Sequence, residues 1–164
     1  MSKFNPDKHH RGSIRLEGYD YSCPGAYFVT ICAQGRACLF GDTVDCTLND
    51  AGKMVLKIWT NIPNYFPGVS IDEAVVMPNH FHGIIVLDGI QPLRLGDILE
   101  RLKSLTTKRY IDGVKNFGWP GFSGRLWQRN YYERILDSDA MLENTRNYIR
   151  NNPINWINDE NHPN

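Results

Sequence analysis

Apolar residues in this chain gather in short runs of the kind that form buried strands. The run AYFVTICA at 26–33 is rich in β-branched and aromatic side chains and predicts one strand. Two further runs, at about 69–77 and 80–87, are separated by a short Pro-Asn connection, which predicts an antiparallel pair. A fourth strand is predicted over LWQRNYYERIL at 126–136.

Stretches with helical spacing lie between these strands. The first runs through 51–62, where apolar residues recur on one side. Either Asn49 or Asp50 is placed to cap its N-terminus, and Pro63 and Pro67 are expected to end it.

The clearest helical pattern spans 95–111, where leucine and isoleucine recur every three or four residues. The stretch that follows, 112–124, holds four glycines and a proline and is predicted to be a loop. A last helix is predicted over 139–152, capped by Asp137 or Ser138 and stopped by the proline after it.

The first six elements therefore follow the order of a ferredoxin-like fold, which is also the fold of RNA-recognition domains. We expect an α+β protein with an antiparallel sheet, helices packed on one face, and an additional C-terminal helix. The other face is expected to be free. We divide the 164 residues into a polar N-terminal arm at 1–25, a single domain at 26–153 and a C-terminal tail at 154–164.

The composition is that of an ordinary globular protein, with 41% hydrophobic and 22% charged residues. Eighteen basic and 18 acidic residues give no net charge, so the overall balance does not indicate a nucleic-acid partner. The distribution is more informative, because nine Lys/Arg but only four Asp/Glu lie between Arg94 and Arg134. Such a stretch marks one charged face or an ordinary solvated surface.

The cysteines exclude a zinc ribbon, because none forms a Cys-x-x-Cys pair; they are Cys23, Cys32, Cys38 and Cys46. The polar N-terminus lacks the apolar core of a signal peptide, and no apolar run approaches the length of a membrane span. We therefore expect a reduced, cytoplasmic protein without a membrane partner.

Two histidines stand one residue apart in the third strand run. Since side chains alternate along a strand, His80 and His82 point the same way and Phe81 points opposite. Paired neutral imidazoles suit a divalent metal, but the pair alone favours two surface histidines on a half-exposed strand, because His-x-His arises easily by chance. The adjacent His9 and His10 are a weaker metal candidate and read as part of a polar tail.

The last helix places Tyr148 and Asn152 one turn apart on the same face. Helix physics alone explains them as an aromatic at a core boundary and a polar C-cap. Basic residues supply candidate phosphate contacts: Arg101 and Lys108 share a helix face with Ser104, and Arg129 lies in the last strand run.

Unpaired bases have candidate stacking partners in Trp127 and Tyr131. For each of these residues taken singly, and for the three basic ones, core packing or surface charge is the favoured explanation.

The two segments MPNHFHGIIVL and YIRNNP together resemble the REP-associated tyrosine transposases, a branch of the single-tyrosine HUH transposases. The likeness extends to SIRLEGYDYSCPGAYFVTICAQGR and LWQRNYYERILDSD, so it covers the chain from about Ser13 to Pro153. Insertion-sequence relatives usually carry Gln where this chain has Asn152, whereas the REP-associated branch looks similar to this chain in its Asn-Pro.

This resemblance implies an activity and a set of roles. His80 and His82 match the histidines that bind a divalent metal, Mg²⁺ or Mn²⁺, and Asn152 matches the third ligand. Tyr148 matches the nucleophile that forms a 5′-phosphotyrosine with single-stranded DNA, often beside a hairpin formed by a palindromic repeat. One site would then both cut and rejoin DNA, in a monomer or a homodimer.

Two other functions fit the same residues less well. A ferredoxin-like module that binds single-stranded nucleic acid without cutting it would need aromatic side chains on its open sheet face. A replication initiator or relaxase would use the same nicking chemistry, but the short chain has no helicase part.

Overall fold

The strand β3 (His80–Leu87) lies inside a four-stranded sheet of order β2-β3-β1-β4, in which all neighbours are antiparallel. The computed structural model describes residues 18–163. Its other elements are β1 (Gly25–Cys32), η1 (Gln34–Arg36), α1 (Asp50–Thr60), α2 (Ile62–Tyr65), β2 (Val69–Val76), α3 (Leu95–Phe117), β4 (Tyr132–Leu136), α4 (Asp139–Asn151) and η2 (Trp156–Asn158). This order and pairing confirm the ferredoxin-like α+β fold.

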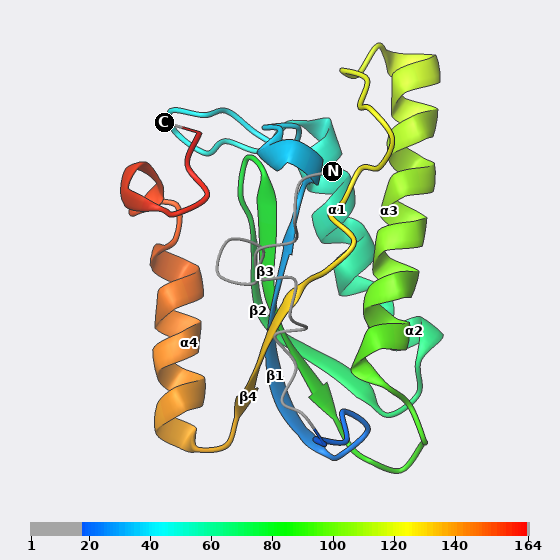
Figure 1. Ribbon diagram of the computed structural model, residues 1–164, viewed down its shortest axis with the longest axis vertical. Coiled ribbons are helices and arrows are strands. Elements are labelled where there is room, and N and C mark those ends of the chain that lie inside the picture. The colour runs from blue at the N-terminus through cyan, green and yellow to red at the C-terminus, as the bar shows by residue number, and fades with distance from the viewer. Residues whose placement is uncertain (1–17, 164) are drawn as a thin grey trace, which may run out of the picture.

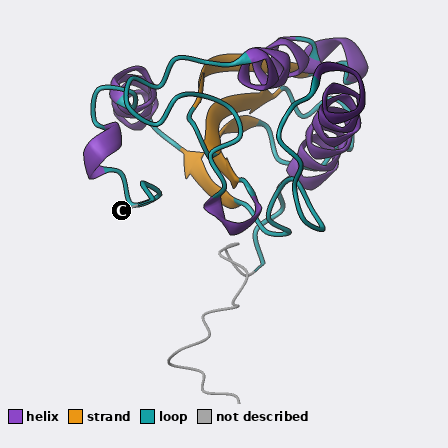
Figure 2. Ribbon diagram, turned by 90° about the horizontal axis from the view of Figure 1, so that it is seen from above, coloured by secondary structure: helices purple, strands orange, loops and turns teal. Residues whose placement is uncertain are grey.

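Helices lie on both sides of the sheet. The helices α1 and α3 cover one face and α4 lies against the other, as Figure 1 and the view from above in Figure 2 show. The main core fills the space between the sheet and the first pair of helices. A smaller cluster of Phe28, Ile84, Leu136 and Ile149 packs beneath α4. The expectation of a free second face was therefore wrong, because α4 occupies part of it.

The central strand shows the alternation that its sequence predicts. Phe81 and Ile85 enter the main core, whereas Ile84 belongs to the cluster under α4. Gly83 is needed on the core side, because a Cβ there would lie 2.7 Å from the Trp59 ring.

The first helix has one of its two predicted N-caps, but it ends earlier than predicted. Asn49 is the N-cap, and its side chain accepts a hydrogen bond from the Gly52 N–H at 2.9 Å. The expected end at Pro63 was wrong, since α1 stops at Thr60 and Pro63 lies in the first turn of α2. Proline is tolerated there because first-turn amides have no helical partner.

The glycine-rich stretch begins as helix rather than loop. The helix α3 continues to Phe117 and ends at Gly118, which has a left-handed φ of 69°. Gly113 is buried inside it because Trp119 folds back over that position and leaves no room for a side chain. The segment 118–131 then runs as a loop, so β4 is shorter than the predicted 126–136 strand.

Within residues 18–163, none of the helices combines the length and apolar character that a membrane span requires. All four cysteines carry free thiols. His9, His10 and most of the predicted N-terminal arm lie outside the described residues.

Candidate active site

His80 and His82 meet on the face of the sheet that α4 covers. Their Nε2 atoms are 3.1 Å apart, and both side chains are buried. The two histidines were predicted to share one face of the strand, with Phe81 on the other. This is confirmed, because Phe81 points into the main core on the opposite side of the sheet. Surface histidines are excluded as an explanation, since His80 is fully buried and His82 is 3% exposed.

Each imidazole is oriented by a polar neighbour on its other ring nitrogen. The Asn79 Oδ1 lies 2.8 Å from His80 Nδ1, while the Asn79 amide group donates to the carbonyls of Arg36 and Asn161. The amide oxygen must therefore accept, so His80 Nδ1 carries the proton and Nε2 presents a lone pair.

His82 has a partner that can work in either direction. The Thr30 hydroxyl lies 2.7 Å from His82 Nδ1. A hydroxyl both donates and accepts, so it supports either tautomer of His82. In one of these tautomers, Nε2 of both histidines is free to bind a cation.

Burial keeps both imidazoles neutral at physiological pH. Burial lowers the pKa of His80 to about 4, against the opposing effect of the Asp159 carboxylate. Burial and the neighbouring His80 hold the pKa of His82 well below its usual range. Neutral imidazole is the form that binds metals.

The helix α4 brings Tyr148 and Asn152 to these histidines. The Tyr148 ring is half exposed, and its centroid lies 5.4 Å from that of His82. Burial and then the Asp159 charge raise the pKa of the Tyr148 phenol, while the Asn152 amide opposes them. Asn152 caps the C-terminus of α4 and is buried, as the helix reading expected of a cap. The structure thus brings together all four residues that the resemblance singled out.

Asp159 is a site residue that sequence reasoning missed. Its Oδ2 lies 3.7 Å from His80 Nε2, and its side chain is only 6% exposed. One ligand atom from each of His80, His82 and Asp159 lies within 4.8 Å of the others. Asp159 follows η2, where Trp156 Nε1 donates to the Thr43 carbonyl at 2.9 Å and fixes the C-terminal segment. No local pattern signals this contact, because it depends on a chain reversal after Pro153.

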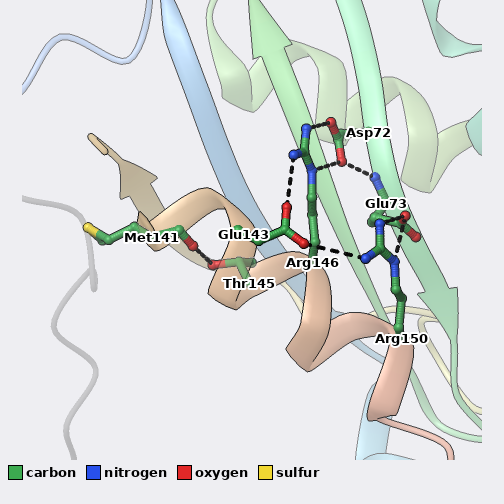
Figure 3. Close-up of polar contacts among 7 residues, drawn as sticks. All are labelled: Asp72, Glu73, Met141, Glu143, Thr145, Arg146 and Arg150. Atoms are coloured by element: carbon green, nitrogen blue, oxygen red, sulfur yellow. Dashed lines mark hydrogen bonds and ion pairs between the residues drawn. The ribbon is translucent and has the colours of Figure 1, made fainter. Parts of the chain in front are cut away.

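Ion pairs fix α4 on the strand beside the histidines. The β2–β3 register shifts between Ile71 and Ala74, and this bulge contains Asp72 and Glu73. Arg146 binds Asp72 at 2.6 and 2.8 Å, and Arg150 binds Glu73 at 2.6 and 2.9 Å (Figure 3).

Glu143 joins the two pairs, at 3.2 Å from Arg146 and 3.6 Å from Arg150. We refer to these five charged residues as the α4 clamp. Since Tyr148 lies between the two arginines in sequence, the clamp sets its position along the sheet.

The donor set fits a divalent cation. Two ligands at about 2.1 Å from one ion lie roughly 3 Å apart when they occupy neighbouring coordination positions. The two Nε2 atoms already have this separation. The Asn152 Oδ1 is buried without a hydrogen-bond partner among the described residues, which a cation would relieve.

The candidate DNA-binding residues separate into two places. Lys108 and Arg129 line a groove of about 1030 Å³ between α3 and the segment 124–131, which we call the α3 groove. Arg101 lies elsewhere, with its guanidinium 5.1 Å from the Tyr65 ring centroid.

For Trp127 the favoured explanation, core packing, is confirmed, because its ring is buried in the core and its indole N–H donates to Thr106; a stacking role on bases is thereby excluded. Tyr131 does line the α3 groove.

The chain is similar to known proteins in sequence and in fold. A family model for IS200-like transposases matches residues 28–152. An uncharacterized protein of Haemophilus influenzae is 39% identical over 97% of both chains.

The fold resembles the structure of a REP-associated tyrosine transposase bound to a REP hairpin, with a TM-score of 0.60 and 19% identity over 88% of this chain and 77% of that one. A candidate transposase from Deinococcus radiodurans gives a TM-score of 0.54 and 20% identity over 84% and 95% of the two chains. Because the family model matches residues 28–152, which are most of the chain, the chain belongs to the family of IS200-like transposases.

Proposed function

We propose that this transposase cleaves and rejoins single-stranded DNA in a metal-dependent reaction, through a covalent 5′-phosphotyrosine at Tyr148. The observation that carries the proposal is the half-exposed Tyr148 ring beside the buried histidine pair. A nucleophile needs access to substrate and metal ligands need a fixed geometry, and these residues meet both requirements.

Cleavage exchanges one ester bond for another. The Tyr148 oxygen attacks the scissile phosphorus as its phenol gives up a proton. The bond to the upstream 3′ oxygen breaks, and that oxygen takes up a proton to become a 3′-hydroxyl. The phosphate stays joined to the downstream 5′ end through Tyr148. Attack by a 3′-hydroxyl reverses the exchange and joins strands without ATP.

His80 and His82 would hold the cation, Mg²⁺ or Mn²⁺, with Asn152 as the third ligand. When bound, the cation supplies Lewis-acid stabilisation of the phosphate oxygens and a positive field that favours the Tyr148 phenolate. Asn79 and Thr30 keep the imidazoles in the required orientation. Asp159 adds a carboxylate at the same place and increases the attraction for a cation.

Two observations support single-stranded DNA with a hairpin as the substrate class. The REP-associated transposase of similar fold was bound to a REP hairpin. In this chain, Lys108 and Arg129 lie in the α3 groove, where they can neutralise phosphates of such a hairpin. A phosphate contact at Arg101 would require the DNA to continue along α3 beyond this groove.

The proposed site can be formed by one chain. Tyr148 and both histidines come from the same chain, and the α4 clamp fixes their relation. We therefore infer that a monomer is sufficient for cleavage, and that a homodimer, if formed, is not needed to assemble the site. The reaction is expected in the cytoplasm, where its DNA substrate lies.

A covalent-adduct assay tests the proposal. The protein is incubated with Mn²⁺ and a labelled, hairpin-bearing oligonucleotide, and the products are separated under denaturing conditions. We expect an adduct that resists denaturation and disappears in Tyr148→Phe. Tyr65→Phe is the matched control, since Tyr65 is 47% exposed and lies on α2.

Different outcomes separate the alternatives. Cleavage that persists in Tyr148→Phe would overturn the assignment of the nucleophile. Hairpin binding without any adduct, over a wide range of sequences, would instead favour a non-catalytic single-strand-binding module.

A further inference from the structure

A second hollow lies directly beside Tyr148 on the same face of the sheet. Its volume is about 300 Å³, and we call it the tyrosine pocket. Its walls come from β1, β4 and α4, and they are formed by Phe28, Tyr132, Arg134, Met141, Asn144, Thr145 and Tyr148. It is separate from the α3 groove, which lies along α3.

The strand register connects this pocket to the histidines. Thr30 on β1 pairs with His82 on one side and with Tyr132 on the other. Phe28 pairs with Arg134 in the next row of the same face. Residues directly opposite one another in an antiparallel sheet are neighbours. Tyr132 and Arg134 on β4 are therefore separated from the candidate metal ligands on β3 by a single strand, β1.

The pocket presents aromatic surface and positive charge together. The Phe28 ring stacks on His82 and meets the Tyr132 and Tyr148 rings edge to face, at 6.4 and 6.0 Å between centroids. Tyr132 is 39% exposed, so one of its surfaces is available to a ligand. Within residues 18–163, Arg134 has no ion-pair partner.

These properties fit an unpaired nucleotide better than a purely apolar ligand. Aromatic side chains on the open face of a ferredoxin-like sheet stack on unpaired bases, and Arg neutralises the neighbouring phosphate. Asn144 adds an amide that can pair with a base edge. The volume is at the low end for small-molecule sites, which suits one nucleoside and excludes a base pair.

We propose that the tyrosine pocket binds one unpaired nucleotide adjacent to the scissile phosphate, with its base stacked on Tyr132 and its phosphate near Arg134. The inference rests on the proposed function and adds a substrate subsite to it. A base held in the pocket fixes the strand on the same wall that carries Tyr148. The adjoining phosphate is thereby placed at the phenol, which lowers the entropic cost of attack.

The test measures coupling between one protein ring and one DNA base. Tyr148→Phe serves as the background, because it keeps the ring while preventing cleavage. Hairpin oligonucleotides carry a single abasic residue at each unpaired position in turn, and their affinities are measured by fluorescence anisotropy. Wild-type protein maps the cleavage position separately by adduct formation.

We expect one abasic position, next to the cleavage site, to weaken binding about tenfold, as loss of one stacked base does. Tyr132→Ala should weaken binding of intact DNA to the same extent. Tyr132→Ala combined with DNA that is abasic at this position should lose no more affinity than either change alone, because both changes remove the same contact. Tyr132→Phe keeps the ring and should restore the coupling.

Tyr65→Ala is the matched control, an exposed aromatic on α2 that should show no coupling at any position. Melting temperatures of the Tyr132 variants check that they fold. Additive losses at every position would overturn the inference, and so would a coupled position away from the cleavage site. Failure of the proposed function would be seen separately, as the absence of adduct with wild-type protein.

Discussion

Arg146 on α4 donates two hydrogen bonds to the Asp72 carboxylate on β2, with Nε–Oδ1 and Nη2–Oδ2 distances of 2.8 and 2.6 Å. Such paired contacts fix direction as well as distance. They matter here because α4 buries only one side chain completely, that of Ile149. The position of Tyr148 therefore depends on polar contacts more than on packing.

Asp72→Asn tests this dependence. Loss of the charge should lower the free energy of unfolding by about 1 kcal/mol, the range of a well-formed, partly exposed ion pair. Adduct formation in single turnover should fall several-fold, since the phenol is less well aligned. The exchange Asp72→Arg with Arg146→Asp should recover part of both losses. Urea unfolding and adduct kinetics give the two measurements.

Lys53→Gln supplies the control for this variant. Lys53 pairs with Asp50 at 3.7 Å on α1, and both side chains are largely exposed. Its removal should change neither stability nor adduct formation measurably. If both variants lowered stability and adduct formation equally, the loss of any ion pair, and not of the α4 clamp in particular, would be responsible.

The same pair predicts a dependence of stability on pH. The hydrogen bonds from Arg146 lower the pKa of Asp72 below its usual value. A carboxyl group with a depressed pKa stabilises the fold above its unfolded pKa of about 3.9, and loses this effect as the pH falls through its folded pKa. The stability difference between wild type and Asp72→Asn should therefore be constant from pH 7 to about 5 and shrink below pH 4. A difference that stays unchanged to pH 3 would contradict this assignment.

Local periodicity was sufficient to predict the parts of the site that lie within single elements. The period of two along β3 placed His80 and His82 together, and the turn of α4 placed Tyr148 and Asn152 together. That these two pairs meet follows from the sheet order and the packing of α4, which the family resemblance implied and the residue pattern alone did not.

Features that depend on distant contacts were missed. Gly113 has the appearance of a helix breaker, but it lies inside α3, and Trp119 beyond the end of that helix packs against it. Asp159 reaches the histidines only because the chain turns back after α4. In each case the deciding partner lies outside the element to which the local pattern belongs.

Thr30→Val tests the orientation of His82. The substitution keeps the shape of the side chain but removes the hydroxyl that contacts Nδ1 at 2.7 Å. Since such outer partners commonly contribute tenfold or more to metal affinity, Mn²⁺ binding should weaken by at least that factor. Electron paramagnetic resonance of free Mn²⁺ measures the affinity without DNA or activity. Thr60→Val, at an exposed position on α1, should bind Mn²⁺ like wild type.

Asp159→Asn tests whether the C-terminal segment belongs to the metal site. Removing a carboxylate 3.7 Å from His80 Nε2 should weaken Mn²⁺ binding about tenfold or more, because the attraction of opposite charges is strong at a buried position. Glu160→Gln is the matched control, because it removes one carboxylate charge from the next residue along the chain. The Glu160 side chain is exposed, so this variant should change Mn²⁺ affinity little. Equal losses of Mn²⁺ affinity in both variants would indicate that only the net negative charge of this segment matters, and would refute a specific role for Asp159.

Arg129→Gln tests the path of the DNA through the α3 groove. Lys103 donates to the carbonyls of Gln128 and Arg129 and so holds the far wall of the groove against α3. The Arg129 side chain on this wall is exposed and available to phosphate. Its loss should weaken hairpin binding for all sequences alike, and should reduce the slope of log affinity against log salt by about 0.9. Lys57→Gln, on the exposed side of α1, should leave this slope unchanged. An unchanged slope in Arg129→Gln would place the hairpin elsewhere on the molecule. If Arg129 contacts a phosphate, its loss must reduce the number of counterions that are released when the hairpin binds.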